Sequence, residues 1–174
     1  MSTTHVYIIG GLDTPRDPDP EEAGGYEGLT EIAGLKNSHG YHMAIWRHAW
    51  EQSGRRDPIP LFGDGKELWA LSSDPRMAEH LRIAHASTFD RAIITRENVG
   101  RVADALETTA AEIDAAGRWS HLVEVARLIR TTPLPEGARG FGLDTSLSDV
   151  WLGYPSDGND GFDLFDATSA EEAP

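Results

Sequence analysis

The feature that most constrains the fold is an amphipathic repeat within residues 96–117. Its apolar residues are separated by three or four positions: Val99, Val102, Leu106, Ala110 and Ile113. This spacing places the side chains on one face of an α-helix, and Gly117 predicts the helix end. A helix with one apolar stripe must bury it, so the chain has to supply a second layer.

Other segments supply that layer. Runs rich in β-branched and aromatic residues predict three strands, at residues 5–12, 91–95 and 138–146. Capping residues followed by helical periodicity predict further helices at 38–52, 74–87 and 120–132, while residues 67–73 suit a short strand or a helical turn. This order favours an α+β fold, with a short sheet of about three strands packed on one face with about four helices.

Length and composition place the predicted core in a single globular domain, residues 1–154. A chain of 174 residues with 39% hydrophobic residues is long enough for one such core. Residues 13–36 mix Pro, Gly and acids without a period, so we expect an irregular acidic loop. Residues 155–174 hold six acids and no base, which predicts a disordered acidic tail.

The charge of the chain excludes some classes of partner. The formal net charge is −14, and nucleic acids and anionic membranes are bound through cationic surfaces. We therefore expect no nucleic-acid or membrane partner. The first residues lack the pattern of a secretory signal, and no apolar run has the length of a membrane span, so the expected location is cytoplasmic. Arginine far outnumbers lysine, which indicates a GC-rich bacterial or phage gene.

The sequence contains no motif for thiol chemistry or for binding a nucleotide cofactor. The chain has no cysteine, which excludes disulfides, thiolate nucleophiles and cysteine-bound metals. The sequence IIGGLDTP at residues 8–15 lacks the third glycine of a dinucleotide fingerprint, and FGDGKE at residues 62–67 lacks the spacing of a phosphate-binding loop. We expect no cofactor.

Residues 37–50, NSHGYHMAIWRHAW, concentrate histidines beside tryptophans. On a helix His39 and His42 lie about 60° apart and could share a metal ion, whereas His48 lies about 120° from His42. A metal site would need a third ligand from another element. We favour a packed amphipathic helix with Trp46 in the core, and keep a metal site at His39 and His42 as the alternative.

The last twenty residues contain a short acid–aromatic alternation. Acids separate the only large apolar side chains that could offset the entropy of ordering such a segment. We favour an inert solubilising tail, and keep as the alternative that this segment docks an apolar groove on a protein partner. The predicted partner-binding residues are Phe162, Leu164, Phe165, Asp160, Asp163 and Asp166.

These observations favour a non-enzymatic interaction protein over an enzyme. An example would be an immunity-type or phage-encoded inhibitor that binds a more basic partner protein. One alternative is a small metal-dependent or His-based hydrolase that uses His39 and His42. Another is a structural subunit of a larger particle. The sequence leaves the oligomeric state open, a homo-oligomer included, and size in solution separates this last alternative from the others.

Overall fold

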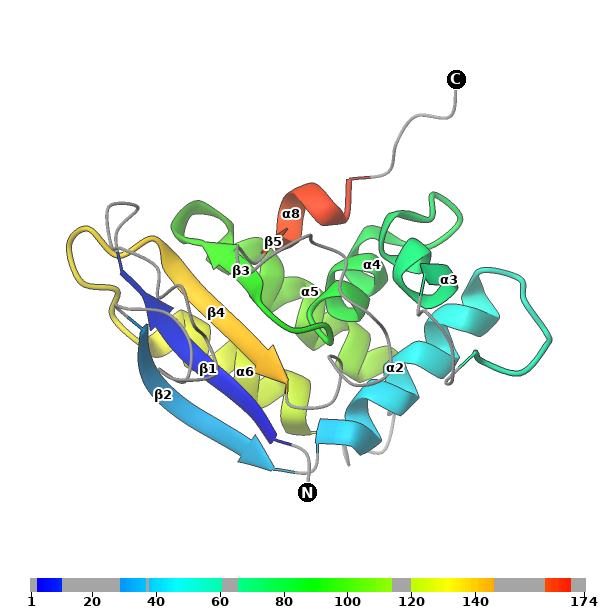
Figure 1. Ribbon diagram of the computed structural model, residues 1–174, viewed down its shortest axis with the longest axis horizontal. Coiled ribbons are helices and arrows are strands. Elements are labelled where there is room, and N and C mark those ends of the chain that lie inside the picture. Colours follow the sequence, from blue (N-terminus) through cyan, green and yellow to red (C-terminus); the bar gives the residue numbers. More distant parts are fainter. Residues whose placement is uncertain are drawn as a thin grey trace.

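The computed structural model describes residues 3–10, 29–36, 38–60, 66–113, 120–145 and 162–169 (Figure 1). Within these ranges the strands are β1 (Thr3–Ile9), β2 (Leu29–Lys36), β3 (Ala92–Thr95), β4 (Gly140–Thr145) and β5 (Phe162–Asp163). They form one mixed sheet in the order β2-β1-β4-β3-β5. The pairs β1–β2, β1–β4 and β3–β4 are antiparallel, and β3–β5 is parallel. The predicted α+β class is confirmed.

The helices surround one side and one end of this sheet. They are α2 (Ser38–Gln52), α3 (Lys66–Trp69), α4 (Glu79–Ala86), α5 (Val99–Ile113), α6 (Ser120–Thr131) and α8 (Leu164–Ala167), with 3₁₀ turns η1 (Ala70–Ser73) and η2 (Arg96–Asn98). The helices expected at 38–52 and 120–132 lie where the sequence predicts them, and the repeat within 96–117 forms α5. Among the described residues, no helix has the length and apolarity needed to cross a membrane.

The sheet has five strands among the described residues, where the sequence predicts about three. Residues 29–36, which we assigned to an irregular loop, form β2 and pair with β1 along its length. The register shifts between Val6 and Tyr7, so β2 carries a bulge that breaks its apolar alternation. Pairing with a neighbouring strand thus overrides a weak local pattern.

Part of the segment expected to be a disordered tail also differs from the prediction. Residues 162–169 form β5 and α8 against the rest of the fold. The physical reason is that Leu164 finds a fully buried site, at 0% exposure, which the composition of the segment does not reveal. The remainder of residues 155–174 lies outside the described residues, where disorder stays a prediction.

Two apolar clusters form the core. The larger lies between the sheet and the helices α5 and α6, and includes Val6, Phe141, Leu106 and Ile129. The smaller lies beneath α2 and contains Trp46, Trp50, Leu68, Leu71 and Phe89. The indole of Trp46 donates a hydrogen bond to Thr88 Oγ1 at 2.8 Å. The predicted burial of the tryptophan face of α2 is therefore confirmed.

The sheet presents different chemistry on its two faces. Val6 of β1 and Leu143 of β4 are register partners and both belong to the larger core cluster. Because side chains alternate along a strand, His5 and Tyr7 point to the opposite face. In Figure 1, α5 and α6 lie behind β1 and β4, on the core side. We call the other side the open face.

Candidate functional site

The predicted metal ligands lie at the start of α2. The imidazole of His42 is only 4% exposed, with ring centroids 5.9 Å from Trp46 and 6.4 Å from His121. The side chain of His39 is outside the described part of the structure. Among the side chains that are described, no group of three His, Asp or Glu is placed to hold a metal ion. A metal site at His39 and His42 stays a prediction.

The predicted partner-binding residues contact the chain itself. Leu164 is fully buried, and Phe162 and Phe165 pack against the larger core cluster. The carboxylate of Asp163 caps α8 by accepting hydrogen bonds from the backbone amides of Phe165, at 2.8 Å, and Asp166, at 3.3 Å. Asp160 lies outside the described residues. Partner binding through this segment stays a prediction, and it would require the segment to leave the fold.

A polar cluster that we did not single out from the sequence lies on the open face. The open-face cluster consists of His5, Tyr7, Glu31 and Asp144, contributed by β1, β2 and β4. His5 Nδ1 lies 2.8 Å from Glu31 Oε1, and the His5 and Tyr7 rings are stacked at 6.1 Å between centroids. Asp144 is the register partner of His5 across the β1–β4 pair. Three strands thus bring four ionisable side chains onto one surface.

Two glycines and the bulge make room for this cluster. Gly34 is the register partner of His5 on β2, and a Cβ there would lie 3.2 Å from Glu31 Oε1. Gly142 is the partner of Tyr7 on β4. The bulge in the β1–β2 pair brings Glu31 opposite Tyr7. The space beside Gly34 is taken by the side chains of Glu31 and His5, and Ile9 covers Gly142.

The cluster is exposed and carries a negative field. The side chains of His5 and Glu31 are 34% and 47% exposed. The pKa of Tyr7 is raised, first by partial burial and then by the charges of Asp144 and Glu31. The negative charges of both carboxylates therefore act on the Tyr7 side chain. Lys36 is also exposed, but it lies at the other end of β2 opposite Thr3.

The tautomer of His5 follows from its partner. A neutral imidazole whose Nδ1–H donates to the Glu31 carboxylate has Nε2 left as an acceptor. Carboxylates and this nitrogen accept hydrogen bonds, while the Tyr7 hydroxyl can donate or accept. Chemically the cluster suits a cationic ligand that is rich in donors.

A buried serine–histidine pair lies elsewhere in the fold. Ser72 Oγ and His85 Nδ1 are 3.0 Å apart, between η1 and α4. Burial lowers the pKa of His85 to about 3, so the ring is neutral at physiological pH. Both residues are inaccessible to a substrate in this structure. The pair is therefore a polar contact within the core.

Two histidines share one carboxylate on the helical side. Glu112 of α5 lies 2.8 Å from His80 Nε2 and 3.6 Å from His48 Nε2. His80 Nε2 has no well-aligned hydrogen bond despite the short distance, so the contact is mainly electrostatic. It links α2, α4 and α5. Its evident role is to hold three helices together.

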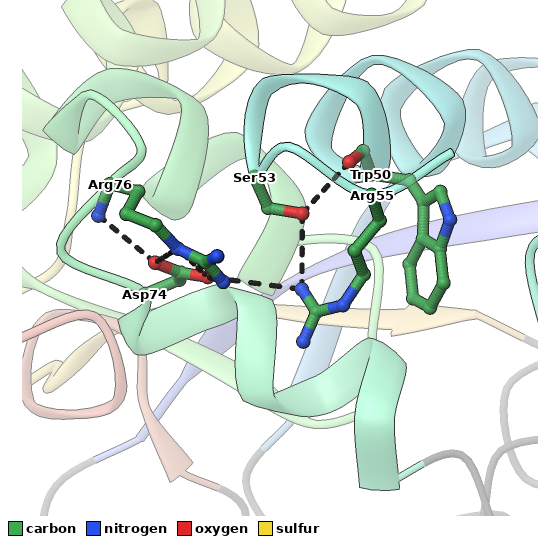
Figure 2. A network of polar contacts seen from close by, with 5 residues as sticks. All are labelled: Trp50, Ser53, Arg55, Asp74 and Arg76. Carbon is green, nitrogen blue, oxygen red and sulfur yellow. Dashed lines mark hydrogen bonds and ion pairs between the residues drawn. The ribbon is translucent and has the colours of Figure 1, made fainter. Parts of the chain in front are cut away.

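An arginine–aspartate network joins the end of α2 to the turn before α4 (Figure 2). Asp74 accepts hydrogen bonds from the Arg76 amide, at 2.9 Å, and from its guanidinium, while Arg55 lies 3.8 Å away. Arg55 also donates to Ser53 Oγ and lies over the Trp50 ring. The side-chain hydrogen bond from Arg76 is the main cause of the lowered pKa of Asp74.

This network corrects one detail of the sequence analysis. The sequence predicts a helix over residues 74–87, but α4 begins only at Glu79. Asp74 instead stabilises the turn that precedes α4, because its carboxylate accepts a hydrogen bond from the backbone amide of Arg76, two residues further on. Asp74 is engaged by both arginines and serves the local turn, so we take the open-face cluster as the candidate site.

Comparison with known proteins adds no assignment. A scan against protein-family models finds no match to this chain, and neither the curated proteins nor the solved structures include a significant match. The alternation in β1 could have placed His5 and Tyr7 on one face from sequence. Glu31 and Asp144 could not have been added, because their positions depend on strand register.

Proposed function

We propose that this chain is a non-enzymatic interaction protein that binds a more basic protein partner through the open-face cluster. The observation that carries this proposal is the register of three strands, which makes Glu31 the partner of Tyr7 and Asp144 the partner of His5 on an exposed sheet face. A lysine or arginine of the partner would meet two carboxylates and an aromatic ring there.

The shape of the face suits a macromolecule better than a small ion. Asp144 is exposed and the side chains of His5 and Glu31 are 34% and 47% exposed, while Ile9 covers the backbone at Gly142, so the face offers side chains over a surface and not a closed cavity. Tyrosine and arginine are frequent anchors where proteins meet, since each combines apolar area with a polar end. The proposed contact is an arginine or lysine of the partner against Tyr7.

The charge of the whole chain supports the same class of partner. A net charge of −14 steers a basic protein toward the surface and accelerates association at low ionic strength. An immunity-type or phage-encoded inhibitor is one kind of protein that works in this way. We place the chain in that class as a proposal, with binding expected to weaken as salt is added.

One observation favours a second candidate, a His-based hydrolase. Glu31 orients His5 as a carboxylate orients a catalytic imidazole, with Nε2 left to accept a proton. Of His39 and His42, the two histidines on which we based this alternative, His42 is too buried to meet a substrate in this structure, and the side chain of His39 lies outside the described part. Ester hydrolysis that is lost in His5→Gln would favour the enzyme over the interaction protein.

The experiment that tests the proposal compares two charge-matched double variants. Immobilised wild type, Glu31→Gln/Asp144→Asn and Glu107→Gln/Glu124→Gln would each be exposed to lysate of the native cell. We expect wild type and the helical control to retain the same basic protein, and the open-face variant to lose at least nine-tenths of it. Equal retention by the open-face variant would show that this cluster is not the binding site.

The remaining alternative, a structural subunit, has a separate test. Light scattering coupled to size exclusion would measure the mass of the purified chain. A discrete homo-oligomer would favour the structural subunit, whereas a monomer would favour the interaction protein.

A further inference from the structure

Residues 162–169 add a short edge strand and one helical turn to the sheet at β3. Phe162 and Asp163 pair in parallel with Ala92 and Ile93 of β3, and the Phe162 amide donates to the Arg91 carbonyl at 3.1 Å. The chain then turns into α8, which packs against α4 and β3. In Figure 1 this segment (red) lies beside β3, on the side away from β4.

Each large apolar side chain of the segment has its own contact site. Leu164 is fully buried in the larger core cluster. The Phe162 ring packs edge-to-face on Trp69, with centroids 5.0 Å apart. The Phe165 ring lies 4.0 Å from the guanidinium carbon of Arg101. The surface therefore selects a leucine between two aromatic residues.

A hydrogen bond from α4 also joins the segment to this surface. Arg82 donates one hydrogen bond to the Thr168 carbonyl, at 3.1 Å, and another to the Met77 carbonyl, at 2.7 Å. The segment itself contributes the acids Asp163 and Asp166 and no base. Arg82 of α4 therefore binds the backbone of this segment, while Arg101 of α5, paired with Glu79 at 2.7 Å, lies against the Phe165 ring. We call the surface formed by β3, Trp69, Arg82 and Arg101 the seat.

The segment does not use the whole strand edge. Its described pairing ends at Ile93, whereas β3 continues to Thr95. A peptide that stays extended for longer could pair with the last residues of β3 and gain backbone hydrogen bonds. The seat can therefore accept a stronger ligand than the segment that occupies it here.

We propose that the seat is a peptide-docking site, and that residues 162–169 occupy it as an intramolecular ligand. The external ligand is an acidic segment of a partner protein, with an extended aromatic–Asp pair followed by leucine and a second aromatic residue. A second copy of this chain is disfavoured as the source, because its identical segment competes with one tethered at an effective concentration of about millimolar. A partner segment gains by pairing further along β3.

The test uses the full chain and a labelled synthetic peptide of residues 160–170 as the probe. Fluorescence anisotropy would measure peptide binding to wild type and to Leu164→Ser, in which the tethered segment loses its buried anchor. We expect the variant to bind the peptide at least tenfold more tightly than wild type. A peptide that carries the same Leu164→Ser change is the control and should not bind. Equal binding to both chains, or no binding to a folded variant, overturns the proposal.

A second measurement needs no variant. Hydrogen exchange of wild type should show the Phe162 amide exchanging through an opening that leaves the amide of Leu106 in α5 protected. Exchange of both amides at the rate of global unfolding would make the segment an integral part of the core and would refute a docking role. A wild-type dimer that the peptide dissociates would assign the seat to a second copy and overturn the partner proposed here.

Discussion

Acidification should destabilise this fold at a pH where its carboxylates are still ionised. The cause is a pair of buried histidines, His85 and His121. Burial lowers the pKa of His85 from 6.5 to about 3 and that of His121 from 6.5 to about 4. His121 stacks on Tyr41 at 4.3 Å between centroids, and its ring is edge-on to His42.

The direction follows from where each state binds its protons. Below pH 6.5 the imidazoles of the unfolded chain become protonated, while the folded chain keeps both rings neutral until the pH approaches 4 and 3. Stability is therefore complete above pH 6.5 and falls as the pH decreases toward the folded pKa values. Between pH 7 and pH 5 each histidine should remove about 2 kcal/mol, hence about 4 kcal/mol for the pair. A domain stability of about 5–15 kcal/mol makes this loss large.

The carboxylates that stabilise the fold become protonated at a more acidic pH than the histidines of the unfolded chain, so the two contributions to the pH dependence can be separated. The hydrogen bonds from Arg76 lower the pKa of Asp74, so its contribution is lost only as the pH falls below the ordinary value of 3.8. A comparison of pH 7 with pH 5 therefore reports mainly on the histidines. Urea unfolding followed by tryptophan fluorescence would measure the free energy at each pH.

The decisive variant is His121→Phe, which keeps an aromatic ring against Tyr41 and removes the titrating nitrogen. We expect it to lose about half of the pH dependence, or about 2 kcal/mol between pH 7 and pH 5. The control Tyr41→Phe keeps His121 and should retain the full dependence. A wild-type stability that is equal at the two pH values, or a His121→Phe dependence equal to that of wild type, would refute the reasoning.

Three further outcomes check the packing and the metal hypothesis. Trp46→Ala should lower the free energy of unfolding in urea by about 3–5 kcal/mol, because it removes a buried indole. The control Val123→Ala, at an exposed position, should change it by less than about 0.5 kcal/mol, and similar values for the two variants would contradict the packing. Gly140→Ala should destabilise the fold strongly in the same assay, since its Cβ would lie 2.0 Å from the Ile94 carbonyl oxygen. Gly100→Ala, which meets open space in α5, should instead stabilise the fold by about 0.5–1 kcal/mol. A tolerated Gly140→Ala would argue against the β3–β4 register. Equilibrium dialysis should find no stoichiometric zinc on wild type, and zinc that disappears in His42→Ala would restore the metal site.

The parts of the fold that the sequence predicts are those with strong local patterns. The three- and four-residue spacing from Val99 to Ile113 matches α5 residue for residue. The β-branched runs around Val6 and Ile93 give β1 and β3, because such residues pack well on a pleated surface. α5 buries one continuous face, which periodicity finds, whereas β3 is buried on both faces and is found as a short β-branched run.

The two missed strands have separate physical causes. In β2 the bulge adds one residue, Ile32, between Glu31, which pairs with Tyr7, and Ala33, which pairs with Val6. Two apolar residues are therefore adjacent, and the alternation expected of a strand is lost. β5 has two residues, too few for any periodic signal. Its placement depends on the buried site of Leu164, which exists only once α4, α5 and β3 have assembled. The open-face cluster was missed for a related reason, since Glu31 and Asp144 come together only through strand register.

The two proposed binding surfaces should act independently. The open-face cluster is formed by β1, β2 and β4, whereas the seat lies at the β3 edge, and the strand order separates the two. No residue is shared between them, and sites without shared partners usually contribute additively to free energy. Glu31→Gln/Asp144→Asn should therefore leave peptide binding to the Leu164→Ser chain unchanged within about twofold. A larger change would mean that the sheet transmits an effect from one surface to the other, and that occupation of the seat regulates capture of the basic partner.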